Sequence, residues 1–210
     1  MNSSQFNKIL VVKHGSLGDI AFSILAMASI KQFFNNATID LLTEEKYVNF
    51  LSNSNYFNSI FKDNRKGIID SLKVILKINQ NKYDLIIDLQ NSKRTNNYWS
   101  FLKFISEVKV NGSRSNCDIQ YVIPPQGTES PQQGLYNQLK LLGVNEIYQN
   151  VDWLSRDITA INEDKIILMI PGVSKSGKDK QWSPDKFAIL ASTLEKKGYH
   201  ICVIGQKSDK

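Results

Sequence analysis

The sequence predicts an α/β fold whose parallel sheet is covered by helices on both faces. Short apolar runs alternate with helix-like stretches along the chain. The runs KILVV (8–12) and DLIIDLQ (84–90) are almost unbroken by polar residues. Strands of this kind are typical of parallel sheets buried on both sides. A second series of strand, helix and strand begins at residue 165, which indicates a second unit of the same type.

Each element is predicted from its own pattern. Residues 20–34 are apolar nearly all round and predict a buried helix, and residues 68–78 have an amphipathic period near 3.6. Thr43 is a candidate N-cap, the Ser183–Pro184 pair is a typical helix start, and Gly143 suits a helix end. The strands expected are 8–12, 37–42, 59–63, 84–90, 108–112, 165–171 and 199–205, and the helices are 20–34, 43–53, 68–78, 96–105, 131–143 and 183–198. Residues 113–130 are expected to be a loop.

The domain organisation follows from this order. We expect a first α/β domain over 1–150, a polar linker over 151–164, and a second α/β domain that starts at 165 and is incomplete at 210. The second stretch provides only β–α–β, and pieces of about 45 residues rarely bury enough surface to fold alone. A helix would be expected where the chain stops, so we expect a fragment or truncated product.

Composition narrows the class of protein. The net charge of +6 favours an anionic partner, although an inert basic surface explains it about as well. Two cysteines and two histidines in unrelated positions make a zinc site or a disulfide framework unfavourable, so no metal is expected. The longest apolar run, residues 20–30, is too short to span a membrane.

The loop KHGSLGD (13–19) follows the first strand and opens onto a helix. Ligands bind at this edge of open parallel sheets, and helix N-termini favour anions. The spacing of Gly15 and Gly18 is neither that of a dinucleotide fingerprint nor that of a P-loop. From spacing alone, Asp19 is either a plain N-cap or a chemically active carboxylate, with the cap favoured.

Three further loops could bind anions. The loop 171–184 contains Lys175, Lys178 and Lys180, the loop 88–97 contains Lys93 and Arg94, and the loop 62–67 is basic. For each, a solvated polar loop is the alternative. His14 and His200 contribute little to any hypothesis, and no Ser/His/Asp or Cys/His set follows from residue order.

Together these segments resemble glycosyltransferase family 9, the lipopolysaccharide heptosyltransferases. The opening 8–45 resembles the family's strand, (R/K)-x-x-x-x-GD loop and long helix. The segment YDLIIDLQNSKRT resembles its Y-D-x-x-I-D-x-Q motif, VKVNGSRS its short strand, and IPGVSKSGKDKQWSPDKF its P-G-(A/T)-S and K-x-W segment. His14 stands where the family often has a small residue.

The resemblance implies a GT-B fold, in which two doubly wound Rossmann-like domains provide an acceptor side and a nucleotide-sugar side. It implies an inverting transfer of heptose, or a related sugar, from an ADP-sugar to an anionic inner-core lipopolysaccharide acceptor, without metal or other cofactor. The enzyme would be bacterial and cytoplasmic, in peripheral contact with the inner membrane and with no nucleic-acid partner.

Residue roles follow from the same resemblance. Asp19 matches the proposed catalytic base, and Lys180 matches a lysine that neutralises the leaving diphosphate. Ser16, Gly18 and Ser174 match donor-binding positions. Arg65, Lys66 and Lys93 match the region of the acceptor-binding cations.

The sequence departs from the family in length. A D-(T/S)-G-x-x-H segment that helps to hold the donor is absent from the 210 residues, so we expect weak or no transfer from this chain alone. A non-catalytic nucleotide- or glycan-binding module, and less favourably a Rossmann-type oxidoreductase, remain alternatives.

Overall fold

The computed structural model describes residues 3–149, 151–155, 165–173 and 175–205, with the side chains of 175 and 176 left aside. The chain divides into two compact units, Met1–Ser155 and Arg156–Lys210. The expected linker falls largely outside the described residues. The predicted domain limits remain predictions.

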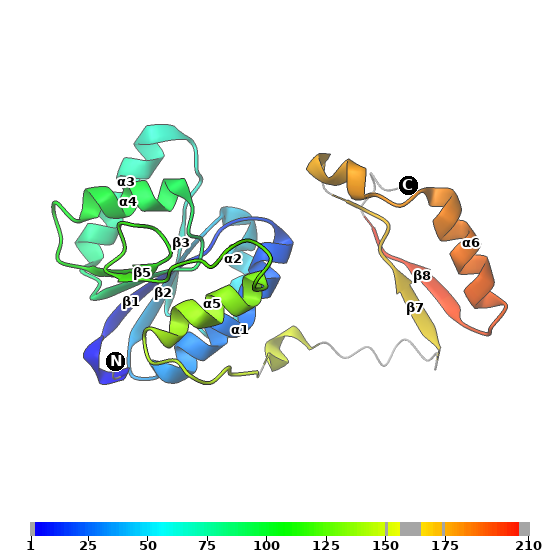
Figure 1. The fold of residues 1–210 in the computed structure, drawn as a ribbon, viewed down its shortest axis with the longest axis horizontal. Helices are drawn as coiled ribbons and strands as arrows, with labels where there is room; N and C mark the ends of the chain where they lie inside the picture. The colour runs from blue at the N-terminus through cyan, green and yellow to red at the C-terminus, as the bar shows by residue number, and fades with distance from the viewer. Residues whose placement is uncertain (1–2, 150, 156–164, 174, 206–210) are drawn as a thin grey trace. The chain divides into compact units, whose positions relative to one another are not determined.

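The first unit contains a six-stranded parallel sheet with the strand order β3-β2-β1-β4-β5-β6 (Figure 1). This order is that of the doubly wound nucleotide-binding folds. All neighbouring strands pair in parallel, so the carboxyl ends of β1 to β4 meet at one edge. The strands are β1 (Lys8–Val12), β2 (Thr38–Thr43), β3 (Ser59–Lys62), β4 (Leu85–Asp88), β5 (Lys109–Gly112) and β6 (Ile119–Gln120).

Helices cover both faces of this sheet. Alternate residues of β1 point to opposite sides, since side chains of a strand have a period of two. Ile9 and Val11 pack in the core under α1 and α5, whereas Leu10 and Val12 pack in the core under α3 and α4. The helices are α1 (Leu17–Phe33), α2 (Glu45–Leu51), α3 (Gly67–Asn81), α4 (Lys93–Leu102) and α5 (Pro131–Lys140), with short 3-10 turns at Ser3–Gln5, Ser52–Ser54 and Asp152–Leu154.

The described part of the second unit has the same β–α–β pattern. Strands β7 (Ile166–Met169) and β8 (His200–Val203) pair in parallel, and α6 (Pro184–Glu195) connects them. Ser183 caps α6 and Pro184 occupies its first turn, as predicted. A 3-10 segment, η4 (Lys175–Lys180), precedes this helix.

Several predicted elements differ from the structure. Thr43 is the last residue of β2 and not an N-cap, and Glu44 precedes α2 without a side-chain capping bond. Helix α4 starts at Lys93 and not at 96, because Ser92 and Thr95 form a capping box. The stretch 113–130 was expected to be a loop, but Ile119–Gln120 adds a short sixth strand beside β5.

Candidate functional site

Asp19 lies in the first turn of α1, at the carboxyl edge of β1. Its Oδ2 accepts hydrogen bonds from the Ser16 backbone N–H at 2.7 Å and from the Ser16 hydroxyl at 2.8 Å. Ser16 is the N-cap and Asp19 the third helical residue of a capping box. The interpretation of Asp19 as a plain N-cap is therefore wrong, since its carboxylate holds the cap from inside the helix.

Asp19 is exposed and ionised. The Ser16 backbone hydrogen bond lowers the pKa of its carboxyl below the ordinary value, partial burial opposes this, and the Ser16 hydroxyl and the charge of Lys13 assist it. Within the described part of the chain both hydrogen bonds to this carboxylate end on Oδ2. None of the described residues donates a hydrogen bond to Oδ1.

The backbone around Gly15 is shaped to bring the chain close to Asp19. Gly15 has a φ of +116°, and a Cβ at this position would lie 2.6 Å from Asp19 Oδ2. The loop after β2 fixes the same residue, because the Gly15 N–H donates to Glu44 Oε1 at 3.0 Å and the Tyr47 hydroxyl donates to the Gly15 carbonyl at 3.0 Å. Only glycine fits this position without strain.

Lys13 lies buried behind this loop. Its Nζ donates to the Leu89 carbonyl at 3.1 Å. Burial lowers the pKa of Lys13, while the charges of Asp19 and Asp88 act in the opposite direction. The lysine thus links the end of β1 to the end of β4 beneath the Asp19 turn.

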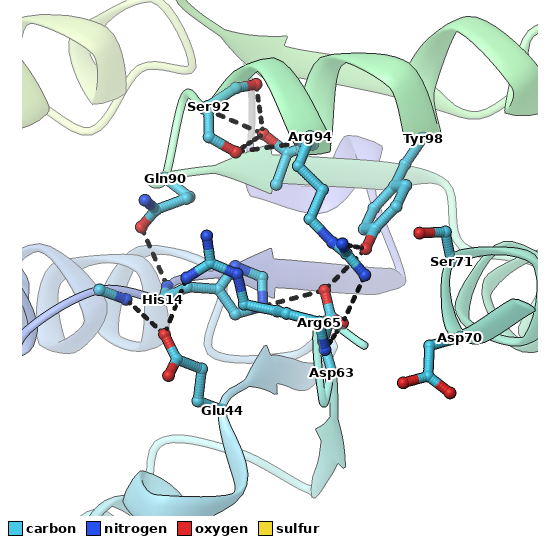
Figure 2. A network of polar contacts seen from close by, with 12 residues as sticks. His14, Glu44, Asp63, Arg65, Asp70, Ser71, Gln90, Ser92, Arg94 and Tyr98 are labelled. Carbon is cyan, nitrogen blue, oxygen red and sulfur yellow. Dashed lines mark hydrogen bonds and ion pairs between the residues drawn. The ribbon is translucent and has the colours of Figure 1, made fainter. Parts of the chain in front are cut away.

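A polar network centred on Asp63 joins the ends of four strands (Figure 2). The fully buried Asp63 carboxylate accepts from the Tyr98 hydroxyl at 2.8 Å, the Arg65 backbone N–H at 2.9 Å and Arg94 Nη2 at 3.5 Å. His14 Nε2 lies 3.5 Å from its Oδ2. These groups follow β1, β3 and β4, and Glu44, which accepts from Arg65 in the same network, follows β2, so four parallel strands bring the network together.

His14 is neutral in this network. Burial lowers its pKa to about 4, against the attraction of Asp63, and Arg65 and Arg94 lower it further. The 3.5 Å contact with Asp63 is therefore not an ion pair at neutral pH, and His14 Nε2 is a buried nitrogen without a hydrogen bond.

Of the cations predicted to bind the acceptor, Arg65 belongs to this network, whereas Lys66 and Lys93 are exposed beside it. Arg65 has a left-handed φ of +56° and donates through Nη1 to Glu44 Oε1 at 3.1 Å. Lys66 is exposed and directly precedes α3, and Lys93 is the exposed first residue of α4. Arg94, next to the predicted Lys93, is the residue that enters the network and contacts Asp63 and Tyr98.

The other predicted donor-binding residues are separate. Gly18 is exposed beside Ser16, and Lys180 is exposed at the end of η4 in the second unit. Ser174 lies outside the described residues. Trp182 packs against Phe187 with ring centroids 5.0 Å apart, which fixes the start of α6 close to Lys180.

Within the described ranges, no cluster of three or more His, Cys, Asp or Glu side chains could hold a metal ion. Over the same residues, none of the helices combines the length and the apolar character needed to cross a membrane.

The fold and site define a class, namely α/β proteins with a Rossmann-like sheet that carry a glycine-rich turn and a carboxylate after the first strand. Residues 135–210 match the family model of glycosyltransferase family 9 (heptosyltransferase). A lipopolysaccharide heptosyltransferase 1 from Campylobacter coli is 32% identical over 87 residues, which are 40% of this chain and 25% of that protein. Lipopolysaccharide heptosyltransferase 3 from Escherichia coli is 22% identical over 88% of this chain and 59% of its own length. Over residues 135–210 the chain is therefore similar to glycosyltransferase family 9.

Solved structures confirm the fold. A family 9 glycosyl transferase from Veillonella parvula superposes with a TM-score of 0.73 at 19% identity. The match covers all of this chain and 65% of the length of that protein. Escherichia coli heptosyltransferase WaaC with ADP-2-deoxy-2-fluoro heptose gives a TM-score of 0.63 at 14% identity, with 96% of this chain and 70% of its own covered. These neighbours are GT-B proteins, so the predicted fold class is confirmed for the part that this chain contains.

The chain is shorter than its relatives. It spans 25% and 59% of the lengths of the two curated relatives described above.

Proposed function

We propose that this chain forms the acceptor side, and the beginning of the donor side, of an inverting sugar transferase. The proposed donor is ADP-heptose or a related ADP-sugar, and the proposed acceptor is an anionic inner-core lipopolysaccharide. The observation that carries the proposal is the exposed Asp19 carboxylate, fixed by Ser16 at the carboxyl edge of β1 in a chain that is similar to this family.

Asp19 is proposed to act as the general base. The acceptor oxygen forms a bond to the anomeric carbon while the bond from that carbon to the donor phosphate oxygen breaks, and the hydroxyl proton passes to Asp19 Oδ1. The lowered pKa of Asp19 makes it a weak base. Proton transfer therefore belongs late in the reaction, when the attacking oxygen has become acidic.

The other residues keep the proposed roles that the resemblance implies. Lys180, with Ser174 in the same loop, would neutralise the charge that grows on the departing ADP. Ser16 and Gly18 would border the donor. Ser16 also anchors Asp19, so its loss would affect both groups.

Arg65, Lys66 and Lys93 are proposed to bind the anionic acceptor. The charge near this edge supports this, because Arg65 is held by Glu44 while its side chain stays 40% exposed. An enzyme with a membrane-anchored acceptor would work in the cytoplasm at the inner membrane, and this location is part of the proposal.

The test is a transfer assay on the protein encoded by the complete open reading frame, with ADP-heptose and a lipid acceptor that carries acidic sugars. Asp19→Asn is expected to lower kcat by at least about 10²-fold. Its affinity for ADP-heptose, measured by calorimetry, is expected to stay unchanged.

The matched control is Asp185→Asn, which removes another acidic residue from a first helical turn, that of α6. This variant should keep its turnover. Full activity in Asp19→Asn would falsify the assignment of the base. Acceptor binding without transfer by the unmodified protein would favour a binding module.

A further inference from the structure

Helix α3 carries an apolar stripe on its outer surface. Ile68 and Ile69 are 80% and 70% exposed, and Leu72 and Leu76 are exposed as well. At 100° per residue these four positions lie on one side of the helix. Isolated exposed apolar residues are common, but a continuous stripe of large ones marks an interaction surface.

Packing among the described residues of the first unit does not explain the stripe. The inner side of α3 is already used, because Val74, Ile75 and Ile78 are buried in the core beneath α3 and α4. Figure 1 shows α3 with α4 on the side of the sheet opposite α1 and α5. Helix α3 is therefore apolar on two sides, of which the sheet covers one.

The positive charge around the stripe indicates an anionic partner. The segment 65–82 contains five cations, Arg65, Lys66, Lys73, Lys77 and Lys82, and one acid, Asp70. Lys66, Lys73 and Lys77 follow the edge of the stripe at helical spacing. Lysines beside an apolar stripe characterise helices that lie in the interface of an anionic bilayer.

We propose that the outer face of α3 docks on an anionic lipid bilayer. Ile68, Ile69, Leu72 and Leu76 enter the boundary between headgroups and acyl chains, and Lys66 and Lys73 contact lipid phosphates. The Lys77 ammonium instead lies over the Phe61 ring, 4.1 Å from its centroid. The docking itself needs no sugar transfer. The role of the docking in catalysis rests on the proposed function. Helix α3 begins directly after Arg65 and Lys66, so docking would bring the proposed acceptor-binding edge to the headgroups that carry the acceptor.

The test is cosedimentation of the 210-residue chain with vesicles that contain no glycan. Vesicles of phosphatidylglycerol and phosphatidylcholine should bind the chain, and vesicles of phosphatidylcholine alone should bind it weakly. The double variant Ile68→Ser/Ile69→Ser should weaken binding on the order of tenfold, because it removes apolar area from the inserted face. Lys73→Gln should weaken it roughly fivefold, and this loss should shrink at high salt.

The chain offers a matched control pair. Val122 and Ile123 are adjacent, β-branched and 74% and 63% exposed, but they lie outside α3. Val122→Ser/Ile123→Ser should bind like the unmodified chain, and circular dichroism melts should show that both double variants fold. Equal binding by both double variants, or binding that ignores lipid charge, overturns the proposal.

Two further outcomes separate the alternatives. A monomer–dimer equilibrium without lipid that Ile68→Ser/Ile69→Ser abolishes would assign the stripe to a second copy of the chain and overturn the proposal. Vesicle binding together with failed sugar transfer would support the docking face and count against the proposed function.

Discussion

Two aspartates at one edge of the sheet have opposite surroundings. Asp19 is exposed, and both of its hydrogen bonds come from one residue, Ser16, within its own turn. Asp63 is fully buried and is contacted by His14, which follows β1, and by Arg94 and Tyr98 of α4, which follows β4. The comparison teaches that local bonds can hold a carboxylate ready for a ligand, whereas a carboxylate bound on all sides holds the scaffold together.

The largest expected difference between the two is in stability. Asp63→Ala should lower the free energy of unfolding by about 3–5 kcal/mol, because it leaves buried partners without their acceptor. Asp19→Ala should cost about 1 kcal/mol, since it removes only part of a helix cap. Urea denaturation measures both. Equal losses would show that Asp63 is not the structural member of the pair.

The second prediction concerns pH and His14. The folded-state pKa of about 4 lies below the ordinary 6.5, so the unfolded chain binds the proton more readily between these values. Stability from His14 is complete above pH 6.5 and is lost as the pH falls towards 4, by up to about 3 kcal/mol.

Denaturant unfolding at pH 7 and pH 4.5 tests this. His14→Asn should reduce the difference in unfolding free energy between the two pH values. His200→Asn provides the control, because that residue is exposed. An unchanged pH dependence in His14→Asn would assign the acid sensitivity to other groups.

The third prediction concerns the stability cost of adding a side chain at Gly15, in the Asp19 turn. Gly15→Ala should destabilise the protein by about 2 kcal/mol, because alanine is strained at a φ of +116° and its Cβ would collide with Asp19 Oδ2. Gly127→Ala isolates the backbone contribution, since Gly127 has a φ of +88° and no atom within 4 Å of an added Cβ. Thermal melts of both variants give the comparison, and a loss no larger at Gly15 would contradict the predicted collision.

The smallest effect is expected at the caps. Ser16→Ala should cost about 1 kcal/mol of stability and release the Asp19 carboxylate. Ser92→Ala removes the N-cap of the equivalent box in α4, so it should cost a similar amount. The proposed transfer activity separates them, because only Ser16→Ala should reduce it; an equal reduction by both variants would show that the anchor is not specific to Asp19.

The sequence predicted the fold where local patterns were strong. The unbroken apolar runs of β1 and β4 indicated a parallel sheet, and the Ser183–Pro184 pair located the start of α6. Ile119–Gln120 was missed because two residues carry no periodic signal. The start of α1 at Leu17 was readable from the S-x-x-D spacing of Ser16 and Asp19, but the capping serine was not used.

The candidate site was only half predictable for a similar reason. Asp19 lies next to two glycines after a strong strand, which is a local signal. His14 and Asp63 are 49 residues apart, and nothing near either one indicates that the two will meet. Their contact depends on the order of β1, β2 and β3 and on which side chains turn inward, which only the folded sheet decides. The roles of the predicted site residues themselves remain predictions.

The hydrogen bonds that Glu44 and Tyr47 make with the Gly15 backbone limit how the Asp19 turn can change. Residue 15 has no side chain, and its N–H and carbonyl are bound by Glu44 and Tyr47. The backbone conformation at Gly15 is therefore not controlled by a side chain of its own. It is held by a segment about thirty residues further along the chain. Variation that retunes this turn should be sought at positions 44 and 47, outside the glycine-rich stretch itself.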